Sequence, residues 1–346
     1  MRKKVTLSDV ARAAKVSKST VSQYLNHRYE YMSDETRSRI EKTIKELGYR
    51  PNFLARSLKQ KKTATIGVIV ANILHRFTTE ITRAIEDYCH SHDYHVIVCN
   101  TDETPSKEKK YIEMLIAKQV DGLVIIPTGE NVDLYTKIAK EHYPVVFLDR
   151  KVEQVPVPTV VMDNFHAAYE CATHLIGNGH HAISLITAPL SISTRIERVE
   201  GFLAALKDHG LEQSEKYIRN VPIRDIPETV SQLLSMPDPP TALLAGNDLV
   251  LMEILRYVMD HHVHVPQDIA LAVIDDVSFA DFLDPTLTTY KQPAVEMATK
   301  AAEILLSKIE SRQKSDHQEM DGNDDMVIRF RGQLKIRKSS GPNRTG

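Results

Sequence analysis

The chain has 346 residues, 42% of them apolar and 26% charged, which allows two or three globular domains and excludes general disorder. Its three cysteines, Cys89, Cys99 and Cys171, lack CxxC spacing, which indicates a reducing compartment without a disulfide framework or a cysteine-based zinc site. We find no signal peptide and no apolar run near the roughly 20 residues that span a bilayer. We therefore expect a cytoplasmic protein with no membrane partner.

The net charge of −2 conceals two oppositely charged regions. Residues 1–62 hold 16 Lys and Arg against 6 Asp and Glu, a net charge of +10, whereas the other 284 residues hold 28 against 40, a net charge of −12. Such asymmetry is typical of a protein that binds a polyanion at one end. A solvated charged tail is the alternative, but the spaced apolar residues and helix signals of the basic region favour nucleic-acid binding.

The basic region predicts three short helices, at 7–14, 18–26 and 34–48. Thr6 with Asp9, then Ser17, then Ser33 are expected to cap their N-termini, and Gly48 is expected to end the third helix. The connection between the first two helices is only three residues long. This spacing predicts a helix-turn-helix motif, whose second helix enters the major groove of DNA.

The second helix carries small polar and basic side chains on its outward face. Lys18 can donate to guanine, Gln23 can pair with adenine, and hydroxyl or amide side chains suit phosphate oxygens. An ordinary solvated helix is the alternative interpretation. The candidate DNA-binding residues in this region are Thr6, Lys18, Ser19, Thr20, Ser22, Gln23 and Asn26.

From residue 65 onward, strand and helix patterns alternate. The first series predicts strands at 66–71, 95–100, 122–127, 145–149 and 159–163, with helices near 78–92, 106–118 and 132–141. The second series predicts strands at 182–187, 217–221, 242–247 and 269–275, with helices near 194–209, 225–236 and 248–261. A further helix is expected at 294–310, a polar loop at 310–325 and closing strands within 327–337.

The strands of both series are continuous apolar runs, which indicates parallel sheets covered on both faces. Two consecutive series predict two doubly wound α/β lobes that face a cleft. Ligands of such sheets bind beyond the carboxyl ends of the strands.

Motifs along nearly the whole chain resemble the lac-repressor (LacI/GalR) family of bacterial transcription regulators, and within it the 2-keto-3-deoxygluconate operon repressors. These motifs are TLSDVARAAKVSKSTVSQYLN, SDETRSRIEKTIKELGYRPNFLARSLK, TIGVIV, VDGLVIIP, VVFLDR, VVMDN, GND, VIDD and LTTYKQP. The resemblance implies a helix-turn-helix domain at 1–50, a hinge helix and linker at 51–64, and a periplasmic-binding-protein-like domain of two lobes at 65–340, which binds effector and dimerises. It also implies a homodimer or tetramer on pseudo-palindromic double-stranded operator DNA.

The resemblance further implies that a linker helix, at about 52–59, folds on the operator and lies in its minor groove. Leu58 matches the family's apolar wedge, which opens the central base step, and Ala55 and Lys59 are its neighbours in the groove. Unstacking the step costs a few kcal/mol, and the bent DNA then contacts more protein.

The resemblance places effector-binding residues at strand ends and helix starts around the cleft: Phe77, Thr78, Asp149, Arg150, Arg198, Asn247, Asp275 and Gln292. An aromatic face with carboxylates, amides and arginines suits a polyhydroxylated ligand. Additional arginines at 76, 150 and 195 favour an acidic sugar derivative, because guanidinium binds carboxylate or phosphate bidentately. Purine-binding members usually show two adjacent aromatics where this chain has Phe77 and Thr78.

These features together predict a repressor of a carbohydrate-utilisation operon, controlled by a small-molecule effector. A sugar-binding transport receptor shares the two-lobed fold, but it needs an export signal and no basic head. An α/β enzyme is the second alternative, and we find neither an activated nucleophile nor an acid–base pair. The motifs GxGxxG, GxxxxGKS and GxSxG are absent, and the clustered histidines fit no closed metal site, so we expect no catalytic residue, cofactor or metal.

Overall fold

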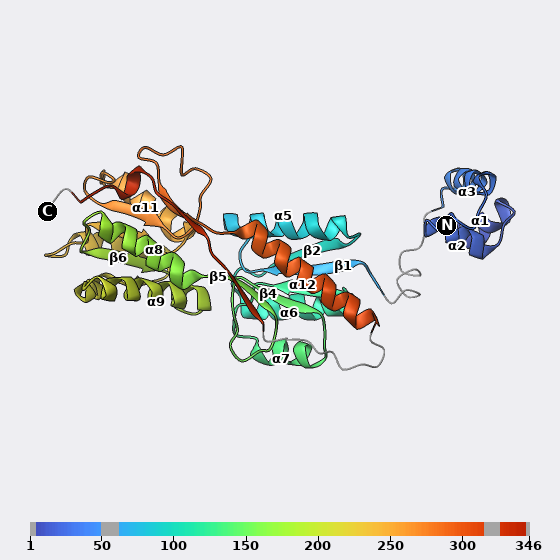
Figure 1. The fold of residues 1–346 in the computed structure, drawn as a ribbon, viewed down its shortest axis with the longest axis horizontal. Coiled ribbons are helices and arrows are strands. Elements are labelled where there is room, and N and C mark those ends of the chain that lie inside the picture. The colour runs from blue at the N-terminus through green and yellow to red at the C-terminus, as the bar shows by residue number, and fades with distance from the viewer. Residues whose placement is uncertain (1–4, 50–61, 315–325, 344–346) are drawn as a thin grey trace. The chain divides into compact units, whose positions relative to one another are not determined.

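The computed structural model describes residues 5–49, 62–314 and 326–343 (Figure 1). The chain divides into two compact units, Met1–Thr63 and Ala64–Gly346, which we call the head and the core. The linker-helix candidates Ala55, Leu58 and Lys59 lie outside the described residues.

The head consists of three helices, α1 (Leu7–Ala13), α2 (Lys18–Leu25) and α3 (Asp34–Leu47). Each begins at the cap that the sequence predicts: Thr6 and Asp9 form a reciprocal capping box, and the hydroxyls of Ser17 and Ser33 accept hydrogen bonds from N–H groups three residues on. Gly48 ends α3 in the left-handed region, at φ 59°. The predicted three-helix arrangement is confirmed.

Only a few side chains hold these helices together. Val10, Ala11 and Ala14 pack against Val21 and Ile40, so all three helices contribute to one small core. A core of this size leaves most of the head's surface to polar and charged residues, which is what a protein that binds a polyanion requires.

The first lobe of the core is a six-stranded sheet of order β11-β5-β4-β3-β1-β2, in which every described pairing is parallel. Its strands are β1 (Thr65–Val70), β2 (His95–Asn100), β3 (Gly122–Ile125), β4 (Val145–Leu148), β5 (Thr159–Met162) and β11 (Val327–Phe330). Two helices pack on each face, α5 (Arg76–Ser91) with α12 (Ala294–Lys314), and α6 (Pro105–Ala117) with α7 (Val132–Lys140).

The second lobe has the strand order β12-β10-β9-β8-β6-β7, parallel except for β12 against β10. Its strands are β6 (Ile183–Thr187), β7 (Arg219–Asn220), β8 (Ala242–Ala245), β9 (Ala270–Val273), β10 (Thr288–Lys291) and β12 (Gln333–Lys335). Helices α8 (Asn164–Gly177) and α9 (Ser193–Asp208) cover one face, and α10 (Ile226–Leu234) and α11 (Asp248–Asp260) cover the other.

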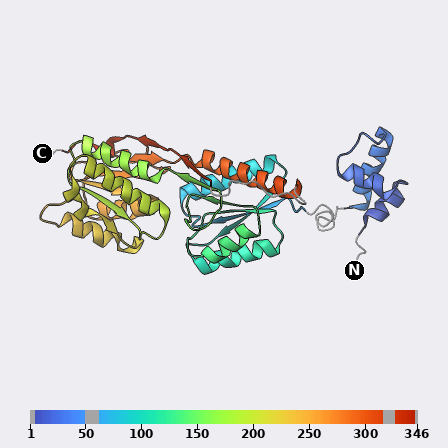
Figure 2. The same cartoon turned by 60° about the horizontal axis from the view of Figure 1, so that its bottom comes forward.

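The alternating pattern predicted two lobes that follow one another in the chain, and this prediction is wrong. The chain crosses to the second lobe after β5, returns after β10 to form α12 and β11, and crosses again to form β12. Figures 1 and 2 show this last ribbon, drawn in dark red, passing from one lobe to the other. Helix α8 and strand β10 were not predicted, and of the predicted strand at 217–221 only β7 forms.

Helices α8 and α9 pack closely because of one glycine. A Cβ atom on Gly201 in α9 would lie 1.9 Å from the carbonyl oxygen of Phe165 in α8. Only a residue without a side chain allows this approach, which brings the middle of α9 against the first turn of α8.

Candidate DNA-binding surface and effector cavity

The recognition helix α2 turns one side toward the core of the head and the other to solvent. Val21 is buried, whereas Lys18 and Ser19 are exposed. Among the described residues, no hydrogen bond or ion pair involves the side chain of Lys18 or Gln23. These two side chains are therefore free to bind base edges, as the sequence predicts.

The other candidate side chains of the head also hold its own structure. The hydroxyls of Ser19 and Thr20 lie 2.6 and 2.8 Å from the Ser17 hydroxyl, and the Thr6 hydroxyl donates to Asp9 at 2.7 Å. The Asn26 amide donates to the carbonyl oxygen of Ser22 at 2.7 Å. A contact with phosphate would use the remaining hydrogen-bonding capacity of these groups.

An aromatic cluster that the sequence analysis missed follows α2. The ring of Tyr29 lies 5.8 Å from that of Tyr24, and the Arg37 guanidinium carbon lies 3.9 Å above its centroid. The Tyr29 hydroxyl is also 2.8 Å from Nδ1 of His27. This cluster ties the loop after α2 to α3, and the repeated tyrosines of the loop were the available signal.

All eight predicted effector residues line one cavity between the lobes, which is partly open to solvent. Their elements begin or end at the carboxyl edges of the two sheets, as doubly wound folds require of a ligand site. The residues are Phe77 and Thr78 in the first turn of α5, Asp149 and Arg150 after β4, Arg198 in α9, Asn247 after β8, Asp275 after β9 and Gln292 after β10. Binding of an effector by these residues stays a prediction.

Four further polar residues line the cavity, and the sequence had indicated only the last of them, among its additional arginines: His75, Glu103, Thr194 and Arg195. Glu103 follows the carboxyl end of β2 by three residues, and its position beyond a strand end was the signal that could have identified it. The Arg150 guanidinium lies 2.5 and 2.8 Å from the two Glu103 carboxylate oxygens, and it also donates to the carbonyl oxygen of Pro127. This bidentate pair neutralises the charge of both groups on the first-lobe wall.

Arg198 is held in place by neutral hydrogen-bond acceptors. Its Nε donates to Oδ1 of Asn164 at 2.9 Å, and its Nη1 donates to the carbonyl oxygen of Gly246. No ion pair within 4.0 Å joins it to Asp149 or Asp275 in the part of the chain that the structure describes. Its guanidinium is nevertheless buried in the cavity wall, held by neutral acceptors.

Two carboxyl groups of the cavity are strongly buried. Burial raises the pKa of Asp275 to about 6, although the positive charge of Arg198 acts to lower it. Burial also raises the pKa of Asp149, although the positive charges of Arg150 and Arg198 act to lower it. Asp275 also accepts a hydrogen bond from the Asp248 N–H at 3.0 Å and one from the Gln292 amide. At neutral pH Asp275 is mostly ionised and presents a hydrogen-bond acceptor to ligand hydroxyls.

Two family models match this chain, together over most of its length. Residues 6–52 match the model described as bacterial regulatory proteins, lacI family. Residues 63–330 match periplasmic binding proteins and the sugar binding domain of the LacI family. The chain belongs to the LacI family.

Relatives of this LacI-family chain are regulators. It is 48% identical to the probable HTH-type transcriptional regulator EndR of Paenibacillus polymyxa, over 91% of this chain and 93% of that protein. It is 35% identical to the HTH-type transcriptional regulator KdgR of Bacillus subtilis, over 90% and 94%. The lac repressor dimer bound to operator and the anti-inducer ONPF superposes with a TM-score of 0.80 at 25% identity, covering 98% and 100% of the two chains.

Membership of the LacI family confirms several predictions from the sequence. The chain is a DNA-binding transcription regulator and not an enzyme, and its relatives are named as regulators. The fold, a helix-turn-helix head with a two-lobed α/β core, is confirmed as well. Family members bind operator DNA and small-molecule effectors and act as dimers.

Side chains bridge the two lobes of this LacI-family core around the cavity. Nδ1 of His75 lies 2.5 Å from a carboxylate oxygen of Asp248, and the Lys151 N–H donates to the Ser193 hydroxyl at 3.0 Å. Burial lowers the pKa of His75, but the hydrogen bond and charge of Asp248 outweigh it and raise that pKa above its ordinary value. These contacts describe a closed arrangement of the lobes.

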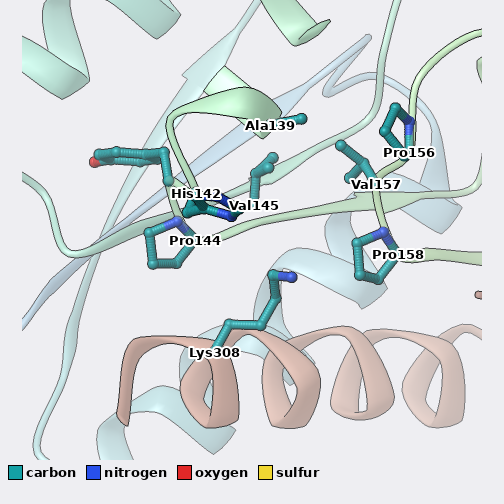
Figure 3. A pocket seen from close by; sticks show the side chains of 9 residues that line it. Ala139, His142, Pro144, Val145, Pro156, Val157, Pro158 and Lys308 are labelled. Carbon is teal, nitrogen blue, oxygen red and sulfur yellow. The ribbon is translucent and has the colours of Figure 1, made fainter. Parts of the chain in front are cut away.

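A second hollow lies at the opposite edge of the first sheet. Figure 3 shows Pro144, at the amino end of β4, and Pro158, before β5, with Lys308 reaching toward them from α12. Its lining is mostly proline and valine, and the carboxyl ends of the strands are remote from it. It therefore lacks the convergent polar groups of the interlobe cavity.

Within the described ranges, three or more His, Cys, Asp or Glu side chains never gather as they would around a metal ion. Cys89, Cys99 and Cys171 are buried and unpaired by disulfides. None of the described helices combines the length and the apolar character needed to cross a membrane.

Proposed function

We propose that this LacI-family regulator is a cytoplasmic repressor of a carbohydrate-utilisation operon. In this proposal, the head binds a pseudo-palindromic operator, and a sugar or sugar acid in the interlobe cavity controls that binding. The observation that carries the proposal is the convergence of eight side chains from both lobes on one cavity. The set combines an aromatic ring with carboxylates, amides and guanidinium groups, which together suit a polyhydroxylated ligand.

For the head, we propose that Lys18 and Gln23 bind base edges and that Thr6, Ser19, Thr20, Ser22 and Asn26 contact the phosphate backbone. The free hydrogen-bonding groups of Lys18 and Gln23 support the first role, and the net charge of +10 over residues 1–62 supports the second. Ala55, Leu58 and Lys59 would enter the minor groove, as the family resemblance implies.

We further propose a homodimer, because two heads are needed to read two half-sites of a palindrome. The lac repressor, solved as a dimer on its operator, supports this assembly. In this chain Met252 and Met259 lie seven residues apart on one side of α11 and are 46% and 74% exposed. Apolar side chains in such positions favour burial against a second copy of the chain.

A gel-shift experiment tests the proposed function. The full chain should shift the DNA upstream of its own gene at a lower protein concentration than it needs to shift a scrambled sequence of equal length. The logarithm of affinity should fall with the logarithm of salt concentration, with a slope near −0.9 for each phosphate contact. Equal affinity for both sequences, or a flat salt response, would contradict the proposal. Sedimentation of the free protein as a monomer at micromolar concentration would contradict the dimer.

A further inference from the structure

The first turn of α9 opens into the interlobe cavity. Ile192, Thr194 and Arg195 line this part of its wall. The first N–H groups of a helix have no acceptor within the helix, and they carry the positive end of its dipole. Ile192 occupies the N-cap position and cannot cap these groups with its side chain, and no acidic residue lies in the first turn. The helix therefore presents unneutralised partial positive charge to the cavity.

Arg195 adds a full positive charge at the same place. Its Nη1 donates to the carbonyl oxygen of Pro189 at 3.0 Å and to the Ser191 hydroxyl at 3.3 Å, and both acceptors are neutral. In the described part of the chain, no carboxylate oxygen lies within 4.0 Å of this guanidinium. Arg150, in contrast, has both Glu103 oxygens within hydrogen-bond distance.

The surroundings of Arg195 disfavour its positive charge and would favour a negatively charged ligand beside it. Burial lowers the pKa of Arg195, and the positive charges of Arg150 and Arg198 lower it further. Glu103 and Asp149 oppose this effect without reaching ion-pair distance. Carboxylates elsewhere in the cavity already have partners, because Asp275 accepts hydrogen bonds from the Asp248 N–H and the Gln292 amide.

An independent observation comes from the first-lobe wall. The side chain of Arg150 is 7% exposed and lines the same cavity. Its Nε–H makes no hydrogen bond with any described residue, and its nearest charged neighbour is an Asp149 oxygen at 3.6 Å. A buried donor without an acceptor is unfavourable by about 1–3 kcal/mol, which a ligand acceptor would remove.

We propose that the effector is a sugar derivative with an anionic group, a carboxylate or a phosphate ester, and that this group binds at the N-terminus of α9 against the guanidinium of Arg195. Hydroxyls of the same ligand would meet Asp149, Asn247 and Asp275. This inference rests on the proposed function and narrows its ligand class. Arg195 thereby distinguishes an acidic sugar from the neutral sugar of the same stereochemistry, because only the acid supplies the missing charge.

Thermal unfolding of the full chain with matched ligand sets tests this inference. One set is glucose, gluconate, glucuronate and glucose 6-phosphate, and a second set contains the corresponding galactose compounds. We expect at least one anionic member to raise the Tm at a concentration where its neutral hexose does not. Gluconate and glucuronate carry a carboxylate at opposite ends of the sugar. Comparing them with glucose 6-phosphate shows whether the site binds a carboxylate or a phosphate ester.

Substitution of Arg195 then identifies the group that binds the anion. Arg195→Gln should weaken binding of the active anion about 10- to 100-fold, the usual value of a charge-assisted hydrogen bond, and Arg195→Lys should recover part of the loss. Arg224→Gln removes the same charge from an 85% exposed side chain of the second lobe and should leave the Kd unchanged. Circular dichroism of the variants checks that they fold.

Three results would overturn the inference. The first is a neutral hexose that binds as tightly as its acids and its phosphate. The second is an unchanged Kd in a folded Arg195→Gln protein. The third is a chain that binds its operator but is stabilised by no anionic member of either set. Failure of operator binding itself counts against the proposed function and not against the anion site, so the two failures are distinguishable.

Discussion

The head and the core hold their functional side chains in opposite ways. In the head, the side chains of Lys18 and Gln23 have no internal partners among the described residues. The helix that carries them begins at Ser17, whose hydroxyl accepts a hydrogen bond from the Thr20 N–H three residues on. In the core, Arg150 and Arg198 are buried and bonded to residues 47 and 34 positions away in the chain, respectively. Substitution of Lys18 or Gln23 should therefore change recognition alone, whereas substitution of Arg150 or Arg198 should change recognition and folding together.

The largest effect is expected from Arg198→Ala, which tests the coupling of function to folding in the core. The variant leaves the Asn164 amide oxygen and the Gly246 carbonyl oxygen without their donor and should lower the stability of the core by about 2–4 kcal/mol. The effector response should disappear while operator binding by the head persists. Chemical unfolding measures the loss of stability, and gel shifts of the folded variant with and without effector measure operator binding and the effector response.

Arg224→Ala, at an 85% exposed side chain of the second lobe, is the matched control for Arg198→Ala. It should keep both the stability and the effector response. A full response in Arg198→Ala would remove this side chain from the effector site, and loss of operator binding would show that the head depends on it.

A smaller loss of stability is expected from Gly201→Ala, which breaks packing in the core without touching the cavity. The new Cβ would lie 1.9 Å from the Phe165 carbonyl oxygen, so α8 and α9 must separate. Overpacking of this kind usually costs about 1–3 kcal/mol. Gly177→Ala makes the same change in α8 where nothing lies within 4 Å, and thermal unfolding of the two variants should differ accordingly.

Gln23→Ala should change recognition in the head without changing stability. Loss of a bidentate base contact should reduce discrimination at one base pair by about 1–3 kcal/mol and leave binding to random DNA nearly unchanged. Competition gel shifts with single-base operator variants measure this. Gln232→Ala, at an exposed side chain of α10, provides the control. Equal weakening on every sequence would assign Gln23 to the phosphate backbone instead.

The smallest effect concerns the pH dependence of the contact between His75 and Asp248. Because the folded-state pKa of His75 is raised above 6.5, the contact stabilises the closed core fully below pH 6.5 and loses this contribution as pH rises through the raised pKa. His75→Gln should therefore lower the Tm more at low pH than at high pH. The exposed His90→Gln, on the same helix, should show no such dependence.

Asp275 adds a pH dependence of its own. Burial raises its pKa to about 6, so its ionisation in the folded state also disfavours the core as pH rises. His75 also lowers the pKa of Asp275, so the difference between the Tm values of the wild type and His75→Gln reports the titration of both groups together. A difference that is constant across the pH range would show that the contact with Asp248 does not raise the His75 pKa.

Local features of the molecule could be predicted from the sequence, and contacts between distant residues could not. Thr6, Ser17, Ser33 and Gly48 mark helix ends through hydrogen bonds or backbone conformations confined to a few residues, so each was predicted in place. The eight cavity residues were predicted because the family resemblance covers each position, and their places at strand ends and helix starts agree with the edge at which such folds bind ligands.

The remaining features depend on which segments meet. His75 and Asp248 are 173 residues apart, and no periodicity in either helix indicates the other. Helix α8 follows β5 without a glycine or proline between them, so nothing in the local pattern separated the two elements. The return of α12 and β11 to the first lobe likewise depends on sheet edges that only the assembled fold presents.

The return of α12 to the first lobe has a consequence during protein synthesis. Strands β3, β4 and β5 lack the helix that covers them until residues 294–314 have emerged, and β5 lacks its outer neighbour until β11 has followed. The helices of the head are complete when residue 47 has emerged, and Tyr49, two residues later, completes the buried part of their core. Domains fold as units in the order of their synthesis. A nascent or prematurely ended chain is thus equipped to engage DNA before it can answer to any small molecule.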